Sequence, residues 1–325
     1  MTNAARDLEH GVGPVPVTVC QATAPGKVIL FGEHAVVYGQ PALAVPVRQV
    51  HASATVTPGG DSFWIDATDL GRSYRLEEAS PGDPLRRAAE LVAERAGLAR
   101  LPAARLSLRS TIPIASGLGS GAAVATAAVR ALAQLVGLAL DAAEVSALVF
   151  ETEKLLHGTP SGIDNTVVAF DQPVYFVKGQ APLPVRVARP FQLLIADTGR
   201  PSPTKITVAE VRAAYDREPE RYERLFVVAG QIAQQARRLI EAGEPDALGP
   251  LMTNNHLLLQ TLGVSSPELD RLVAAAGQAG ALGAKLSGGG RGGNMLALVT
   301  PESKAGVEAA LREAGAVRVI HTLVE

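Results

Sequence analysis

A glycine-rich segment at residues 112–123 holds the groups with the clearest chemical potential in this chain. It reads Ile-Pro-Ile-Ala-Ser-Gly-Leu-Gly-Ser-Gly-Ala-Ala, and the alanine-rich run at 122–132 predicts a helix. Glycine lets the backbone approach a ligand closely, because no Cβ stands in the way. The first N–H groups of a helix lack partners within the helix and carry partial positive charge, so this junction favours an anion such as a phosphate. The alternative is an ordinary turn in which Ser120 caps the helix.

Two nucleotide-binding patterns can be compared with this segment. Residues 117–122 fit G-x-G-x-x-G/A, the dinucleotide pattern that a dehydrogenase would carry. That pattern needs a strand ending directly in its first glycine, whereas Pro113 and three further residues follow the strand predicted at 105–110. The Walker A pattern G-x-x-x-x-G-K-[ST] is absent from the sequence. We therefore expect any bound nucleotide to use a different phosphate cradle.

Length and composition limit the class of protein. A chain of 325 residues can form two domains, each with its own core, and 47% hydrophobic with 19% charged residues is typical of a globular protein. The net charge of −2 gives no general attraction to nucleic acid or to an anionic membrane, so we expect neither as a partner. Cys20 is the only cysteine, which excludes an intramolecular disulfide and suits a cytoplasmic protein.

No targeting or membrane segment is expected. Residues 1–16 contain Asp7 and Glu9 and lack an apolar centre, which predicts a loose tail and not a signal peptide. The run at 122–140 is interrupted by Arg130 and predicts a buried helix and not a membrane span.

The sequence patterns in the first half of the chain predict both strands and helices. Apolar and β-branched patterns predict a helix at 84–96 and strands at 17–22, 42–50 and 105–110, with a further strand pair at 52–57 and 62–65 around a turn at 58–61.

A second helix is predicted to begin after Asp141. Glu144 stands three residues later, which is the spacing of a capping box, and Gly158 is expected to end the helix. Glu153 borders the apolar stripe of this helix, so its carboxylate either lies at the edge toward solvent or points into a cleft.

The Pro-rich segment at 180–190 is typical of a connector between domains. It predicts domains at 1–185 and 186–325. Beyond it, strands are predicted at 191–196, 284–287, 294–299 and 317–323, with helices at 204–280 and 301–314 and a glycine-rich turn at 288–293. Ser266 and Pro267 mark the start of one helix. This order is the split βαβ arrangement of a ferredoxin-like domain.

Three separated segments, at 24–34, 112–123 and 285–293, together resemble the motifs of the GHMP kinase superfamily. Within it the chain is most similar to the mevalonate kinases, on Gly-Glu-His-Ala-Val-Val-Tyr-Gly at 32–39, the segment 153–165, and Asn255-His256-Leu257. The resemblance implies an α+β, two-domain fold with a ribosomal-protein-S5-like N-terminal domain, a ferredoxin-like C-terminal domain and the active site between them.

The same resemblance implies ATP-dependent phosphorylation of the C5 hydroxyl of mevalonate, in isoprenoid precursor synthesis, with Mg²⁺. It makes Asp164 the catalytic base and places Lys27 beside it, stabilising charge on the attacking oxygen. Without the resemblance, Asp164 reads as a turn residue and Lys27 as a lysine at a strand edge. The family is often dimeric, so a homodimer is an expectation.

The resemblance also assigns ligand-binding residues. The loop that would cradle ATP comprises Pro113, Ala115, Ser116, Gly117, Leu118, Gly119, Ser120, Gly121 and Ala122. Glu153 and Ser120 would bind Mg²⁺, which needs only one or two carboxylates beside phosphate oxygens. Glu33, His34 and Thr204 would hold mevalonate. Read alone, His34 would be a structural histidine and Thr204 a helix cap.

Two positions depart from the family pattern. Gly121 stands where the family usually has a second serine, so either Ser120 binds the metal or water replaces the missing hydroxyl. Arg291 stands where the third motif usually has glycine or a small residue. Its guanidinium either neutralises phosphate charge or points outward from a tight turn.

Other functions are alternatives to phosphorylation of mevalonate at C5. Phosphomevalonate kinase and mevalonate 3-kinase use a related scaffold; a phosphorylated acceptor would need extra cations, and Arg200 and Lys205 are available. A nucleotide-binding protein without turnover is a further alternative, because of Gly121.

Overall fold

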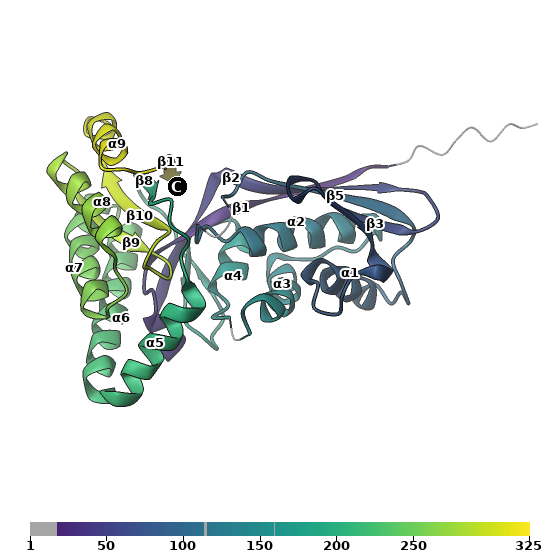
Figure 1. Ribbon diagram of the computed structural model, residues 1–325, viewed down its shortest axis with the longest axis horizontal. Helices are drawn as coiled ribbons and strands as arrows, with labels where there is room; N and C mark the ends of the chain where they lie inside the picture. Colours follow the sequence, from purple (N-terminus) through teal and green to yellow (C-terminus); the bar gives the residue numbers. More distant parts are fainter. Residues whose placement is uncertain (1–17, 114–115, 159) are drawn as a thin grey trace, which may run out of the picture.

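The computed structural model describes residues 18–113, 116–158 and 160–325, so Ala115 and the tail at 1–16 lie outside the described residues. Two layered parts lie side by side (Figure 1). One is a seven-stranded sheet with helices α1 to α4 along one face, and the other is a four-stranded sheet packed against α7, α8 and α9, with α6 beside α7. The α+β, two-domain class expected from the sequence is confirmed.

The seven-stranded sheet is built around one long strand. Its members are β1 (Cys20–Phe31), β2 (Ala42–Pro58), β3 (Phe63–Ala67), β4 (Arg72–Arg75), β5 (Ala104–Ser110), β6 (Val174–Phe176) and β7 (Leu183–Pro184). The order is β4-β3-β5-β2-β6-β7, and β1 pairs antiparallel with the other edge of β2. Short 3-10 turns lie at Ala35–Tyr38 (η1), Thr68–Leu70 (η2) and Leu76–Glu78 (η3).

The strand pair predicted at 52–57 and 62–65 is wrong. The first of these segments is the second half of β2, which runs on from the strand predicted at 42–50. β5 lies between β2 and β3, antiparallel to β2 and parallel to β3. The turn at 58–61 therefore joins two strands that are not neighbours, because β5 provides the buried partner for both.

The four helices of this part are α1 (Pro84–Arg95), α2 (Ser120–Leu135), α3 (Ala142–His157) and α4 (Ile163–Phe170). The predicted capping box of Asp141 and Glu144 is confirmed, since each side chain accepts the other's backbone N–H. α2 is buried almost all round, and its alanines let the sheet and the other helices approach closely. α4 was not predicted, because only eight residues show its period.

The four-stranded sheet confirms the ferredoxin-like order. Its strands are β8 (Phe191–Asp197), β9 (Gly283–Ser287), β10 (Asn294–Val299) and β11 (Arg318–Val324), all antiparallel in the order β11-β8-β10-β9. The helices are α5 (Thr204–Arg217), α6 (Pro219–Ala242), α7 (Leu248–Thr261), α8 (Pro267–Gln278) and α9 (Lys304–Glu313), with a 3-10 turn η4 (Pro245–Ala247). Ser266 caps α8 as predicted.

A shared core joins the two parts. Leu193 and Ile195 of β8 belong to the apolar cluster that includes Leu30 and Phe31 of β1, whereas Leu194 faces the cluster formed with α7 and α8. This alternation is the period of a strand buried on both faces. The sequence-based boundary between residues 185 and 186 lies between β7 and β8 and stays a prediction. Among the described residues, no helix combines the length and apolarity that a membrane crossing needs.

A backbone contact between α7 and β9 yields a stability prediction. A Cβ added to Gly283 would overlap the carbonyl oxygen of Gly249, so Gly283→Ala must push the helix from the strand. We expect the free energy of unfolding to fall by about 1–3 kcal/mol, measured by urea denaturation. The control is Gly277→Ala on α8, where a Cβ meets open space and alanine favours the helix. Equal effects of the two substitutions would contradict this reading.

Candidate active site

The predicted phosphate loop is the glycine-rich segment 112–123, and its described residues Leu118 and Gly119 lie over the stem of Lys27. The N–H of Lys27 in β1 donates to the carbonyl oxygen of Leu118 at 2.9 Å. Gly119, at φ 74°, begins α2 as its N-cap, and a Cβ there would lie 2.8 Å from Lys27 Cγ. Only glycine combines this left-handed conformation with this close approach. Lys27 is consequently buried along its length beneath the positive end of α2.

The ammonium of Lys27 lies against Asp164. Lys27 Nζ is 2.9 Å from Asp164 Oδ2, and the two side chains are 5% and 33% exposed. Asp164 stands in the first turn of α4, where the helix N-terminus favours a negative charge. Gly162, at φ 92°, turns the chain into this helix. The structure thus brings together the two residues predicted to share the catalytic step and leaves the carboxylate partly open.

Glu153 points from α3 to the first turn of α2. Its side chain is buried, and Oε1 has no hydrogen-bond partner in the described part of the chain. A Cβ at Gly121 would lie 3.1 Å from that oxygen. Burial, and secondly the negative charge of Asp164, raise the pKa of Glu153 to about 7, while Lys27 opposes the shift. Of the two alternatives for Glu153, the structure shows the one in which the carboxylate points inward.

The third motif lies behind the phosphate loop. Asn294 donates from Nδ2 to the carbonyl oxygen of Ser116 at 2.6 Å, and a Cβ on Gly293 would lie 2.9 Å from the same oxygen. Thr198 at the end of β8 donates to Gly293 from both its N–H and its hydroxyl, at 2.9 Å each. The sequence did not single out Asn294, although an amide directly after a run of glycines was an available signal.

His34 is held beside the turn of the third motif. It has a positive φ of 61°, and its Nε2 lies 3.1 Å from the carbonyl oxygen of Gly289. Burial lowers the pKa of His34 to about 4. The ring is therefore neutral near pH 7, and because a carbonyl only accepts, Nε2 carries the proton and Nδ1 is left as an acceptor.

Thr204 also lies next to this turn. It is the first residue of α5, and Pro203 precedes it as the N-cap, so Thr204 does not cap the helix. A Cβ on Gly289 would lie 2.5 Å from Thr204 Oγ1. The neighbouring Ser202 donates to the carbonyl oxygen of Gly290 at 3.0 Å. Gly289 thus lies next to both His34 and Thr204.

Glu33 forms a buried ion pair with Lys285 of β9, a residue to which the sequence patterns gave no role. Burial raises the pKa of Glu33 and lowers that of Lys285, and their mutual attraction opposes both shifts. Lys285 also donates to the carbonyl oxygen of Leu286 at 2.6 Å. Oε2 of Glu33 has no partner among the described residues. A lysine inside an apolar strand was the signal, since a buried charge needs a partner.

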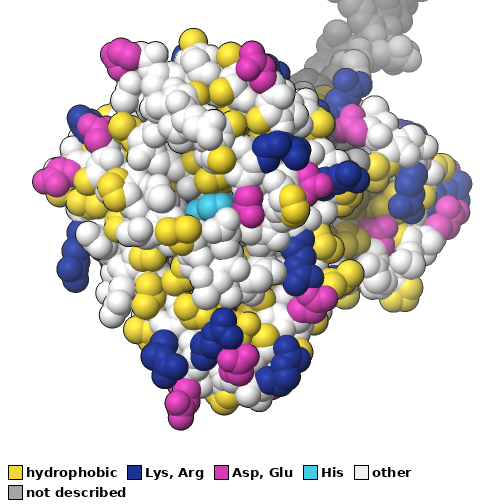
Figure 2. All heavy atoms as spheres, turned by 60° about the vertical axis from the view of Figure 1, so that its left-hand side comes forward, with side chains coloured by type: hydrophobic (Ala, Val, Ile, Leu, Met, Phe, Trp, Pro, Cys, Tyr) yellow, Lys and Arg dark blue, Asp and Glu magenta, His cyan; other side chains and the backbone are white. Residues whose placement is uncertain are grey.

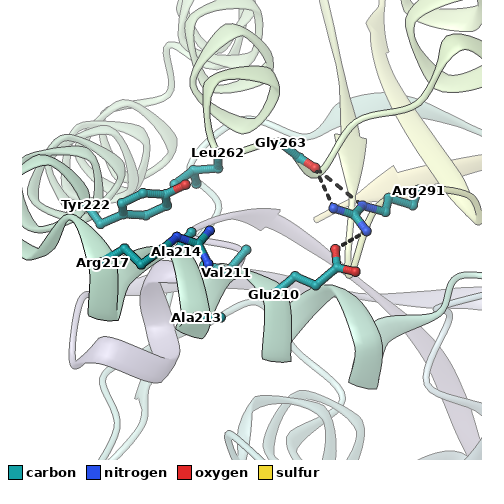
Figure 3. Close-up of a pocket in the computed structure, with 9 residues that line it drawn as sticks. All are labelled: Glu210, Val211, Ala213, Ala214, Arg217, Tyr222, Leu262, Gly263 and Arg291. Carbon is teal, nitrogen blue, oxygen red and sulfur yellow. Dashed lines mark hydrogen bonds and ion pairs between the residues drawn. The ribbon is translucent and has the colours of Figure 1, made fainter.

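Arg291 points away from the phosphate loop. It forms an ion pair with Glu210 of α5, and its guanidinium donates to the carbonyl oxygen of Gly263 (Figure 3). Of the two alternatives for Arg291, the structure shows the one in which the guanidinium points outward from the turn.

Comparison with known proteins agrees with this arrangement. The profile of the GHMP kinases N-terminal domain matches residues 84–172, and that of the GHMP kinases C-terminal region matches residues 236–317. The mevalonate kinase of Thermococcus sibiricus is 38% identical over 92% of this chain and 94% of its own length. The chain belongs to the GHMP kinase family. The mevalonate kinase of Pyrococcus horikoshii is 37% identical to this GHMP kinase over the same shares of the two chains.

A solved structure gives the same answer for the fold. The crystal structure of L. major mevalonate kinase in complex with R-mevalonate has a TM-score of 0.80 and 30% identity to this GHMP kinase, covering 95% of this chain and 97% of that one. The two-domain GHMP kinase fold is therefore shown for nearly the whole length.

The neutral, buried His34 predicts a pH dependence of stability. Its pKa is about 4 in the folded chain against an ordinary 6.5, so the unfolded chain binds more protons between those values. The free energy of unfolding should fall as the pH is lowered through this window, by at most about 3 kcal/mol from this group.

The variant His34→Asn removes the titration and suits a positive φ. Urea denaturation at about pH 7 and about pH 4.5 should show a shallower pH dependence for it than for the parent chain. A slope remains in the variant, because burial also lowers the pKa of His256. Identical slopes would show that His34 titrates normally.

Proposed function

We propose that this GHMP kinase transfers the γ-phosphoryl group of ATP to the C5 hydroxyl of mevalonate, giving 5-phosphomevalonate and ADP in the mevalonate pathway. The observation that carries the proposal is the Lys27–Asp164 pair beside the N-terminus of α2. It combines an acidic group, a buried cation and a positive helix end within one site. The relatives over 92% of the chain are mevalonate kinases.

The chemistry follows from these groups. The backbone N–H groups at the start of α2 hold the phosphates of ATP, because they are unpaired within the helix and carry partial positive charge. The C5 hydroxyl oxygen attacks the γ-phosphorus as the bond to the β–γ bridging oxygen breaks and ADP leaves. Asp164 accepts the hydroxyl proton, and Lys27 stabilises the charge that develops on the attacking oxygen.

The residues present fit a Mg²⁺ ion. The inward oxygen of Glu153 is buried without a partner in the described part of the chain, and it lies beside the first turn of α2. Magnesium favours carboxylate oxygen together with phosphate oxygens, so Glu153 and the hydroxyl of Ser120 would hold it. When bound, it neutralises charge on the β- and γ-phosphates. A cluster of three acidic, histidine or cysteine ligands is absent from the described residues, and none is needed.

The acceptor side is formed by His34 and Thr204. Mevalonate carries hydroxyl groups and a carboxylate, and Nδ1 of neutral His34 can accept a hydrogen bond from a hydroxyl. Thr204 offers a hydroxyl next to Gly289. Glu33 contributes through its unpaired oxygen or by holding β1 in place through Lys285.

The surroundings of the acceptor side argue against phosphomevalonate as the substrate. Arg291 is bound to Glu210, and Arg200 lies 3.6 Å from Glu268. Of the cations considered for an extra phosphate, Lys205 alone lacks an acidic partner among the described residues. Burial lowers the pKa of His157, and the positive charge of Lys205 contributes to the same shift. A protein without turnover is not favoured, because the Lys27–Asp164 pair is in place.

Partners and location complete the proposal. Mevalonate and ATP are the small-molecule substrates, and the protein is a cytoplasmic enzyme that binds neither nucleic acid nor membrane. Support comes from the net charge of −2 and from the face in Figure 2, where basic side chains are interspersed with acidic ones. A homodimer stays an expectation from the family.

The function is tested by ATP consumption with mevalonate, 5-phosphomevalonate, galactose and homoserine, followed by identification of the product. We expect turnover with mevalonate and a phosphate on C5. A product phosphorylated on the C3 hydroxyl would identify a mevalonate 3-kinase, and turnover with another acceptor only would overturn the proposal.

Asp164→Ala should abolish turnover, with kcat reduced by at least about 10²–10⁴-fold, because no group then receives the hydroxyl proton. ATP affinity, measured by calorimetry, should stay nearly unchanged, since the base does not hold the nucleotide. The matched control is Asp171→Asn at the other end of α4, an exposed position in the left-handed region that asparagine tolerates. A kcat near that of the parent chain would remove Asp164 from the mechanism.

Glu153→Gln should raise the Mg²⁺ concentration for half-maximal rate by about tenfold or more, because the amide keeps the shape but loses the charge. The measurement is a Mg²⁺ titration of the rate at saturating ATP and mevalonate. Glu151→Gln, two residues earlier on α3 in an exposed pair with Lys154, is the control. An unchanged requirement would exclude Glu153 as a ligand.

A further inference from the structure

Arg291 adopts a backbone conformation that costs energy for any residue with a Cβ. Its φ is 56°, and among the described residues the other non-glycine positions with positive φ are His34 and Asp171. Glycines surround it in the turn 288–293, and glycine would fit here without strain. The side chain of Arg291 makes hydrogen bonds and an ion pair that glycine could not make.

The side chain of Arg291 joins three segments at one point. Its Nη2 donates to the carbonyl oxygen of Gly263, between α7 and α8, at 3.2 Å, and its Nη1 pairs with Glu210 of α5. Its own N–H donates to the carbonyl oxygen of Val264 at 2.9 Å. Figure 3 shows the guanidinium lying between Gly263 and Glu210. The Arg291–Glu210 pair is 36% and 51% exposed, so it adds little to overall stability.

The first half of α5 has few buried side chains, whereas its second half packs on η1 and α6 through Tyr215, whose ring centroid lies 5.1 Å from that of Tyr38 and 6.0 Å from that of Phe226. Of the 14 residues of α5, all of them described, only Thr207 and Val211 are buried. An open cavity of about 320 Å³ is lined by residues of α5, the start of α6, the end of α7 and Arg291 (Figure 3). Just before the first turn of α5, a first attachment to the turn 288–293 consists of two hydrogen bonds, from Ser202 to the carbonyl oxygen of Gly290 and from the N–H of Gly293 to the carbonyl oxygen of Arg200.

The pair with Glu210 adds a second attachment about 1.7 helical turns beyond Thr204, which is about 9 Å along the helix axis. Two attachments to the same turn fix both the position and the direction of the first half of α5. Thr204 and Gly289, which belong to the proposed acceptor side, adjoin the first attachment, and the carbonyl oxygen of Gly289 lies 3.1 Å from Nε2 of His34.

We propose that Arg291 is a positioning residue for the acceptor side of the site, which through Glu210 and Gly263 holds α5, and with it Thr204, against the turn that contacts His34. The inference rests on the proposed function for the identity of the acceptor. Arg291 acts on mevalonate binding through α5 and not by contact with phosphate.

The test compares Arg291→Gly, which removes the side chain and the strain together, with Glu210→Gln, which removes only the partner charge. Each should raise KM for mevalonate about tenfold, because a small displacement of a binding group has a large effect on binding. KM for ATP should change less than about twofold, and the double variant should be no worse than Arg291→Gly, since the two residues form one link. Arg217→Ala, on the other side of the cavity, is the matched control and should behave as the parent chain.

Stability separates positioning from loosening of the fold. Arg291→Gly should unfold at a temperature equal to or higher than that of the parent chain, because the strain is relieved. A KM for mevalonate within twofold of the parent in both variants would overturn the proposal, as would equal rises in KM for ATP and for mevalonate.

Hydrogen exchange at residues 204–210 tests the link without turnover. Exchange there should be faster in Arg291→Gly and Glu210→Gln than in the parent chain, and equal exchange would overturn the inference. If the parent chain does not phosphorylate mevalonate, the proposed function fails, while this measurement still decides whether Arg291 holds α5.

Discussion

The buried ammonium of Lys27 is the constraint on which the rest of the site depends. A charge removed from water needs an opposite charge or hydrogen-bond acceptors, and the structure supplies Asp164 at 2.9 Å. The stem of the same lysine is covered by Gly119, and its N–H holds Leu118. The strand β1, the phosphate loop and the start of α4 therefore have one relative arrangement in which all of these contacts are made. That arrangement places a carboxylate and an ammonium beside the N-terminus of α2, where the helix end favours an anion.

Polar contacts between the first and third motifs hold the two parts of the fold around this centre. Lys285 pairs with Glu33, Ser287 donates to the carbonyl oxygen of Ile29 at 2.8 Å, and Asn294 donates to that of Ser116. Taking two charges out of water costs about as much as their attraction returns, so a buried ion pair contributes geometry more than stability. An apolar interface tolerates small slips, whereas these contacts are lost if either part moves. Here they fix the distance across the site.

Much of the fold followed from local patterns. The capping box at Asp141, the start of α8 at Ser266 and the ferredoxin-like order depend on neighbours in sequence, and they were predicted correctly. The wrong strand pair at 52–57 and 62–65 came from assuming that a short turn joins neighbouring strands. Which strand lies beside which is decided by the tertiary fold, in which β5 pairs with β2 over seven residues and with β3 over five. α4 was missed because eight residues carry too little periodicity, although Ile163, Thr166 and Val167 lie on one buried face.

The sequence by itself determined the chemical inventory: a glycine-rich loop before a helix, a lysine and an aspartate in separate motifs, and a glutamate at the edge of an apolar stripe. These are properties of residue type and short spacing, which a chain carries before it folds. Only the tertiary structure decided that Glu153 points inward with its pKa raised, that Glu33 pairs with Lys285, and that Arg291 points toward Glu210. Electrostatic environment and side-chain direction arise from burial and from partners up to about 250 residues away, as the 252-residue separation of Glu33 and Lys285 illustrates. No local pattern contains that information.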